Sequence, residues 1–134
     1  RAYYMRCVQG HLDELAECPN AYLDTAMINH AEVLKYAFDH FPAERILFGS
    51  DAPISFLHGK SVEINHQYAY ITPENFDLGT CIHDSGNAVR YAPFLYEQLR
   101  SVLSLDLPPE TLEGFFHGNA GQLYSTTIER MYGK

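Results

Sequence analysis

The sequence predicts an α/β fold, because a strand–helix–strand unit is followed by several helical segments. Residues 21–25 form a short, strand-compatible run bounded by turn formers, and residues 45–50 form an apolar run of strand length. The second run does not alternate between apolar and polar residues, which favours a strand buried on both faces of a parallel sheet. Between them, residues 29–41 carry an apolar stripe with helical spacing. We therefore expect a right-handed βαβ crossover over residues 21–50.

The flanking segments also show helical patterns. Residues 1–18 repeat apolar side chains at three- and four-residue steps until Pro19, which predicts one helix. Asn29, with Glu32 three residues later, resembles a capping box at the start of the next helix, and Pro42 ends that helix. We divide the chain, as parts of one domain, into the ranges 1–18 (helix), 19–53 (strand, helix, strand), 54–89 (insertion loop) and 90–134 (C-terminal helices).

The insertion loop is long, polar and without sustained periodicity. Residues 61–65 and 68–72 could form a small hairpin within it. Helical patterns return over 93–105, 109–116 and 120–131, where Asn119 and Gln122 form a second possible cap pair.

Composition excludes several classes of protein. The chain has 134 residues and a formal net charge of -8, which disfavours binding to a phosphate backbone, so we expect no nucleic-acid partner. No apolar run approaches the roughly 20 residues that span a bilayer, so we expect no membrane association. The cysteines Cys7, Cys18 and Cys81 are odd in number and form no CxxC pattern, which predicts buried thiols in a cytoplasmic protein.

Two strands are too few to bury the faces of four or five helices, because a stable parallel sheet needs more strands and cover on both sides. The chain also begins at Arg1, without an initiator Met or a signal peptide. We expect it to be a piece of a larger fold.

Asp51 stands out among the polar residues. The chain has no nucleophile elbow, Walker loop or dinucleotide fingerprint, and its seven histidines include no metal-binding spacing, so a complete metal site is not encoded. Asp51 directly follows the second predicted strand, at the edge where parallel α/β proteins build their sites. A carboxylate there can hold a divalent metal and accept a proton, although an Asp that shapes a turn before Pro53 is an equally ordinary interpretation.

Three segments carry a resemblance to a known family: P-N-A-Y-L-D-T-A over 19–26, E-R-I-L-F-G-S-D-A-P over 44–53 and F-F-H-G-N-A-G-Q-L over 115–123. They resemble the C-terminal part of metal-dependent hydrolases of the amidohydrolase superfamily, which are TIM barrels. The similarity is greatest to the branch that contains aminocarboxymuconate-semialdehyde decarboxylase.

The resemblance implies that the chain is the C-terminal fragment of a (β/α)8 TIM barrel, in which residues 21–25 and 45–50 are similar to the seventh and eighth strands. It implies that Asp51 is a metal ligand and the catalytic proton shuttle of a hydrolase or decarboxylase. It also implies a divalent metal, zinc first and manganese second, whose other ligands lie outside this chain. The isolated chain should then be inactive, and its partners should be a small-molecule substrate and the missing N-terminal part of the barrel.

Some members of this family carry an insertion after the same aspartate, followed by a helix that resembles residues 93–99. Within the insertion, an anionic substrate could be contacted by His58, Lys60, His83 and Arg90. Ser50 and Pro53 are expected to shape the turn that carries Asp51.

A different class of function stays open. The chain could be a non-catalytic α/β binding or assembly module that completes its sheet by pairing with copies of itself, since exposed strand edges favour such association.

Overall fold

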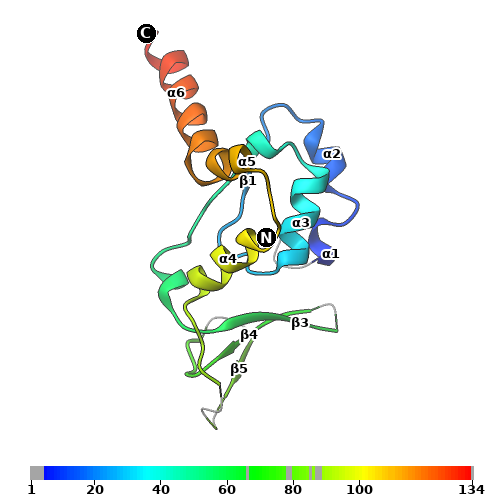
Figure 1. Cartoon of the computed structure of the whole chain (residues 1–134), viewed down its shortest axis with the longest axis vertical. Helices are drawn as coiled ribbons and strands as arrows, with labels where there is room; N and C mark the ends of the chain where they lie inside the picture. The colour runs from blue at the N-terminus through cyan, green and yellow to red at the C-terminus, as the bar shows by residue number, and fades with distance from the viewer. Residues whose placement is uncertain (1–4, 66, 78–79, 85, 87–88, 134) are drawn as a thin grey trace.

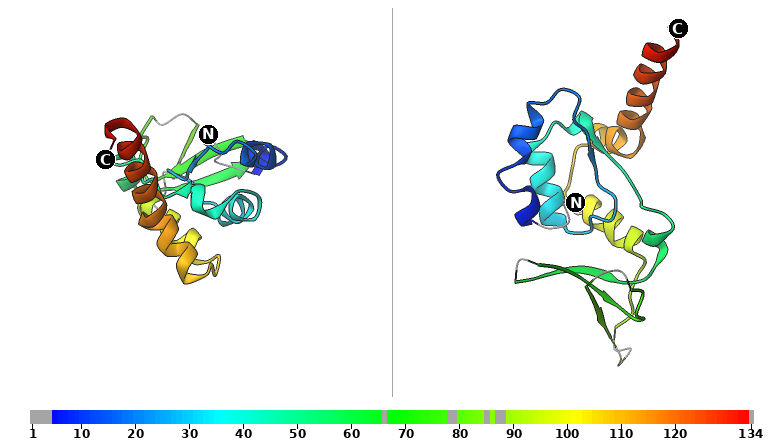
Figure 2. Two further views of the ribbon diagram at one scale, coloured as in Figure 1. Left: turned by 90° about the horizontal axis from the view of Figure 1, so that it is seen from above. Right: turned by 180° about the vertical axis from the view of Figure 1, so that it is seen from behind.

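The computed structural model describes residues 5–65, 67–77, 80–84, 86 and 89–133 (Figure 1). A short parallel sheet lies among helices at the centre, a second sheet lies at one end, and helix α6 projects at the other end (Figures 1 and 2). The fold is therefore a mixed α/β fold, as the sequence predicts.

The central sheet consists of β1 (Leu23–Asp24) and β2 (Ile46–Leu47). They run parallel, with Leu23 opposite Ile46 and Asp24 opposite Leu47. Helix α3 (Ala31–His40) and the 3-10 turn η1 (Ala43–Arg45) connect them. The predicted βαβ unit is confirmed, but each strand has only two residues where the sequence predicts five or six.

One face of this sheet is packed and the other is more open. Ile46, fully buried, points into the main core together with Val33 and Leu34 of α3 and Phe115 near the C-terminus. Asp24 lies on the opposite face, because side chains alternate along a strand, and it is exposed. Among the described residues, the helices thus cover only one side of the parallel pair.

The N-terminal segment forms two short helices, α1 (Met5–Val8) and α2 (Leu12–Ala16), so the prediction of one helix over 1–18 is wrong. Gly10 separates them with a φ of 80°, a left-handed conformation that glycine adopts without a steric penalty. Both helices still pack on α3, since Val8 and Leu12 are buried in the main core.

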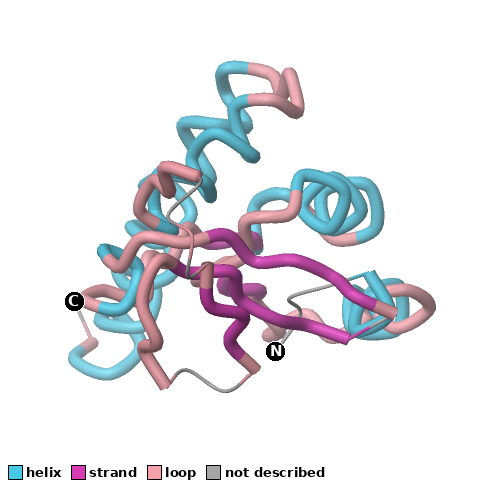
Figure 3. Tube along the Cα trace, turned by 90° about the horizontal axis from the view of Figure 1, so that it is seen from below, coloured by secondary structure: helices cyan, strands magenta, loops and turns pink. Residues whose placement is uncertain are grey.

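The insertion contains more structure than the sequence predicts. After the 3-10 turn η2 (Ile54–Phe56), β3 (Lys60–Ile64) and β4 (Gln67–Thr72) form the expected antiparallel hairpin. A third strand, β5 (Cys81–His83), pairs in parallel with β4 and was not predicted (Figure 3). This sheet packs through Tyr70 on Met27 and Phe94, in a second small core.

Helix α4 (Phe94–Leu103) follows the insertion, and α5 (Pro109–Glu113) continues through a π-helical turn η3 (Gly114–Gly118) into α6 (Asn119–Tyr132). The predicted cap at Asn119 is wrong, because Asn119 is already the first residue of α6 and the backbone is helical at Gly118, with φ −61° and ψ −46°. The Asn119 side chain instead donates two hydrogen bonds of 2.8 Å, to the carbonyl oxygens of Ala43 and Ile46, and so fastens α6 to the start of β2.

The Asn29 cap is also absent: the N-cap of α3 is His30, and no side chain caps the helix. Cys18 is exposed and Cys81 is half-buried, so the prediction of buried thiols is wrong for Cys18. The side chain of Cys7 lies outside what the structure describes. No helix among the described residues is long and apolar enough to cross a membrane.

Candidate functional site

The carboxyl ends of the two parallel strands open into loops with unusual backbone geometry. Met27 follows β1 with a φ of 61°, and Asp51 follows β2 with a φ of 58°. Left-handed conformations are uncommon outside glycine, especially for a long side chain such as Met, and they concentrate at functional sites. This edge of the sheet is therefore the first place to look for chemistry.

Asp51 itself is exposed. Its backbone oxygen accepts a hydrogen bond from the Ser55 N–H at 3.2 Å, and the Oγ of Ser50 accepts one from the Ala52 N–H at 3.3 Å. The Ser50 contact holds the turn after β2. Among the described residues, the Asp51 carboxylate has no hydrogen-bond or ion-pair partner, so it is free to take a ligand or a proton.

A second carboxylate, Asp24, lies close to the same turn, and sequence reasoning missed it. Its Oδ1 accepts a hydrogen bond from the Ala26 N–H at 2.6 Å. A Cβ placed on Gly49 would lie only 2.2 Å from this oxygen, so Gly49 is the residue that lets the two strand ends approach. The usable signal in the sequence was the pair of an Asp inside the first strand and a Gly directly after the second.

Gln98 of α4 ties these two strand ends together. Its side chain is fully buried, and its Nε2 donates hydrogen bonds of 2.9 Å to the carbonyl oxygens of Thr25 and Gly49. The turn that carries Asp51 is thus attached to the helix that follows the insertion.

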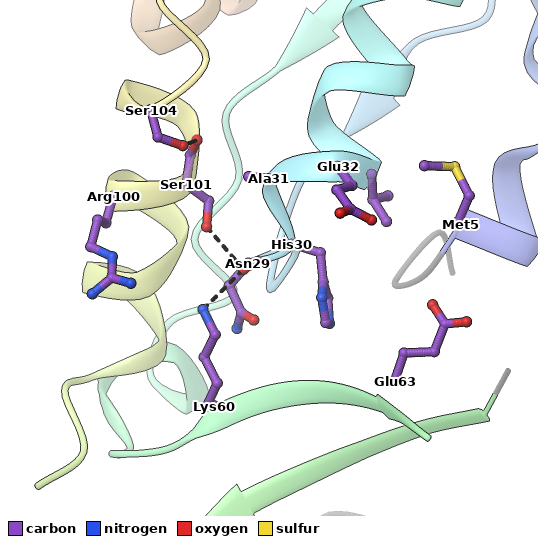
Figure 4. Close-up of a pocket in the computed structure, with 11 residues that line it drawn as sticks. Met5, Asn29, His30, Ala31, Glu32, Lys60, Glu63, Arg100, Ser101 and Ser104 are labelled. Carbon is purple, nitrogen blue, oxygen red and sulfur yellow. Dashed lines mark hydrogen bonds between the residues drawn. The ribbon is translucent and has the colours of Figure 1, made fainter. Parts of the chain in front are cut away.

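A polar cavity of about 440 Å³ lies between α3, α4 and β3 (Figure 4). Asn29 and His30, from the loop after β1, lie in its middle. The pKa of His30 is lowered, chiefly because burial penalises the charged imidazolium and also because Lys60 is close. Its Nε2 is buried and has no hydrogen-bond partner in the part of the chain that the structure describes, and the same is true of both polar atoms of the Asn29 side chain.

The structure brings only one of the four predicted substrate contacts to this cavity. The Lys60 ammonium group lines it and forms an ion pair of 2.6 Å with Glu97. His58, His83 and Arg90 are exposed and do not line it. Asp51 is not among its lining residues either.

The described residues do not supply a complete metal site. No group of three His, Cys, Asp or Glu side chains within them could hold a metal ion together. Asp51 could provide one ligand, but a tightly held ion needs at least two more.

A family model described as Amidohydrolase matches residues 3–126, which is nearly the whole chain. Searches of curated proteins and of solved structures gave no match. The family match includes both parallel strands, the turn with Asp51, the insertion and most of α6. The chain therefore belongs to the amidohydrolase family.

Proposed function

We propose that this chain is part of a metal-dependent hydrolase in which Asp51 is both a metal ligand and the proton shuttle. The observation that carries the proposal is the position of the Asp51 carboxylate at the carboxyl end of a parallel strand, in a chain of the amidohydrolase family. This carboxylate is exposed and has no partner among the described residues. Proteins with parallel α/β architecture place their reacting groups at this edge.

The chemistry of Asp51 follows from its surroundings. A carboxylate that has no partner among the described side chains can accept a proton from water or substrate and return it later in the cycle. Ser50 and Gln98 hold the turn in place from two sides, through the Ala52 N–H and the Gly49 carbonyl oxygen. These bonds hold the backbone that carries the Asp51 side chain.

A divalent metal, when bound, would polarise a carbonyl group or ease the ionisation of water, and zinc suits a site of histidines with one carboxylate. Manganese is the second candidate. The remaining ligands would come from residues outside those described, since no group of three candidate ligands is found within them.

We further propose that β1 and β2 correspond to the seventh and eighth strands of a (β/α)8 barrel. In such a barrel one face of each strand packs on helices and the other faces the interior. The buried Ile46 and the exposed Asp24 on opposite faces support this arrangement. The chain would then need the N-terminal strands as its partner and would be inactive alone.

The substrate is proposed to be a small molecule, and hydrolysis and decarboxylation are both within the chemistry of Asp51. The R-I-L-F-G-S-D-A-P segment supports the branch that is similar to aminocarboxymuconate-semialdehyde decarboxylase.

The test begins with the particle that elutes from a native sizing column, which is analysed by denaturing mass spectrometry. We expect a second polypeptide of roughly 150 residues or more, which would complete a barrel of usual size. In that assembly Asp51→Asn should lower the zinc content per particle and abolish metal-dependent turnover, while Asp39→Asn on the exposed face of α3 should change neither.

A particle that contains only the 134-residue chain and holds no metal would contradict the enzyme proposal and favour an assembly module. One observation favours that second function: α6 projects from the body (Figure 2), and exposed apolar side chains recur along it at helical spacing. These are Tyr124, Ile128, Met131 and Tyr132, each at least half exposed.

A further inference from the structure

The cavity around Asn29 has properties that the chemistry of Asp51 does not use. Both polar atoms of the Asn29 side chain are buried and have no hydrogen-bond partner among the described residues, and the residue is only 1% exposed. A buried amide without partners costs folding free energy. A ligand with one hydrogen-bond donor and one acceptor would remove that cost.

The backbone of Asn29 is held firmly while its side chain is left unpaired. Its carbonyl oxygen accepts hydrogen bonds from the Ser101 Oγ at 2.9 Å and from the Lys60 Nζ at 3.3 Å. These bonds come from α4 and β3, so the backbone that carries the amide is fixed between two elements that are distant in the sequence. A preorganised polar group in a cavity is typical of a binding site.

One end of the cavity is positively charged. Lys60 and Arg100 share a single carboxylate, that of Glu97, at 2.6 Å and 3.8 Å respectively. Two cations and one anion leave a net charge of +1 there. The side chain of Glu97 is only 11% exposed, so this charge lies beside a partly desolvated group, where attraction for an anion is stronger than in open water.

The other end of the cavity carries the exposed carboxylate of Glu32. Figure 4 shows Lys60 and Arg100 on one side of Asn29, and Glu32 on the other side, beyond His30. His30 lies between the two charged ends: Lys60 lowers its pKa, while Glu63 and Glu32 raise it, although burial has the largest effect. The cavity thus has cationic side chains at one end, the Glu32 carboxylate at the other, and between them an amide without a partner among the described residues.

We propose that this cavity binds a short zwitterion with an amide group in its middle, of the kind found in a dipeptide. The carboxylate of the ligand would lie at the Lys60 and Arg100 end, and its ammonium group at the Glu32 end. The peptide group would pair with the Asn29 amide, donor to acceptor and acceptor to donor. A cavity of about 440 Å³ has room for a ligand of this size.

The proposal does not depend on the function assigned to Asp51, because Asp51 does not line the cavity. Asp51→Asn is therefore expected to leave this binding unchanged. A failure of either proposal can be recognised separately.

The experiment is a calorimetric titration of the chain with L-alanyl-L-alanine and its tripeptide homologue. Two capped probes accompany them: N-acetyl-L-alanyl-L-alanine, which lacks the ammonium group, and L-alanyl-L-alanine amide, which lacks the carboxylate. We expect one of the free peptides to bind at least about tenfold more tightly than either capped form, a difference of about 1.4 kcal/mol.

Variants test which end of the cavity recognises the ammonium group of the peptide and which recognises its carboxylate. Glu32→Gln should remove the preference for a free ammonium group, and Arg100→Gln should reduce the preference for a free carboxylate. Both residues are exposed, so folding should survive. Asp39→Asn, on α3 but outside the cavity, is the matched control and should change neither preference.

The proposal is overturned if the capped peptides bind as tightly as the free ones, or if neither free peptide binds. Equal binding of the acetylated form alone would indicate a simple carboxylate site and would also overturn it.

Discussion

The Nε2 of Gln98 donates a hydrogen bond of 2.9 Å to the carbonyl oxygen of Gly49, two residues before Asp51, and a second of 2.9 Å to the carbonyl oxygen of Thr25. One buried amide therefore joins the ends of both parallel strands to α4. The Thr25 N–H donates to the Leu47 carbonyl oxygen at 3.1 Å, which is the last backbone hydrogen bond between the two described strands. The Gln98 bonds connect the two chain segments beyond that point.

Gln98→Met should destabilise the chain by about 1–3 kcal/mol, because the Gly49 carbonyl oxygen would lose its described donor, while the Thr25 carbonyl oxygen would keep only the bond from the Ile28 N–H at 3.0 Å. Urea denaturation measures this as a lower midpoint with an unchanged slope. The same substitution at the exposed Gln122 of α6 is the control and should cost less than about 0.5 kcal/mol. Equal midpoints for the two variants would show that the Gln98 bonds contribute nothing.

Gly49→Ala tests the close approach of the two strand ends. Its Cβ would lie 2.2 Å from the Asp24 Oδ1, so the Asp24 side chain must move and the bond from the Ala26 N–H must lengthen or break. We expect a loss of about 1–3 kcal/mol, typical of overpacking. In the double variant with Asp24→Ala the loss should be smaller than the sum of the single losses.

Gly121→Ala is the matched control for that prediction. Gly121 lies in α6, and nothing comes within 4 Å of an added Cβ. Here alanine should stabilise the helix by about 0.5–1 kcal/mol. Additive effects in the Gly49 and Asp24 cycle would contradict the steric explanation.

Arg45, the last residue of η1 before β2, hydrogen-bonds to three backbone carbonyl groups. Its Nη2 donates to the Ala16 carbonyl oxygen at 2.6 Å, and its Nη1 donates to the carbonyl oxygens of Cys18 at 2.5 Å and Ala21 at 3.3 Å. The guanidinium also lies 4.8 Å from the centre of the Phe41 ring. It thus satisfies carbonyl groups at the end of α2 and along the approach to β1.

Arg45→Met should therefore lower the free energy of unfolding by about 2–4 kcal/mol, and Arg45→Lys should recover only part of it, because an ammonium group cannot reproduce the planar fork. Chemical denaturation of the three proteins compares them. Full recovery by Lys would mean that charge alone matters. Arg130→Met on the exposed face of α6 serves as the reference for loss of a surface arginine.

The sequence predicted the parallel pair correctly because its signals are local. The apolar run at 45–50, the helical stripe and the flanking prolines are each readable within a few residues. The hairpin of β3 and β4 was predicted for the same reason. The third strand was not, because β5 is only three residues long and is defined by its pairing with β4, which no local pattern reports.

The helix caps failed for a related reason. Asn29 and Asn119 both have the residue type and spacing of a cap, yet Asn119 donates to the start of β2 and Asn29 lies in a cavity. A short polar side chain can bond to its own helix or to a distant partner, and tertiary contacts decide between them. The position of Asp51 was predictable from sequence, whereas Asp24, Gln98 and the cavity depend on long-range contacts.

The lowered pKa of His30 makes a prediction about acid stability. Burial and Lys60 disfavour its imidazolium in the folded chain, whereas the unfolded chain takes up that proton near the ordinary value of 6.5. Below about pH 6.5 the unfolded state thus binds more protons at this site, and stability falls as pH falls, by at most about 1.4 kcal/mol per pH unit for one proton. Above that pH the neutral ring contributes no slope.

His30→Gln should consequently reduce the fall of the unfolding temperature between about pH 7 and pH 5, because a glutamine side chain does not take up a proton in this range. Thermal unfolding followed by circular dichroism across this range gives the slope, and His117→Gln at an exposed position controls for removal of an imidazole. Carboxylates that titrate at lower pH are common to all three proteins and cancel in the comparison. A His30→Gln slope equal to that of the wild type would mean that the charged ring is accommodated in the cavity. A steeper slope would mean that protonation of His30 stabilises the folded chain, which is the opposite of this prediction.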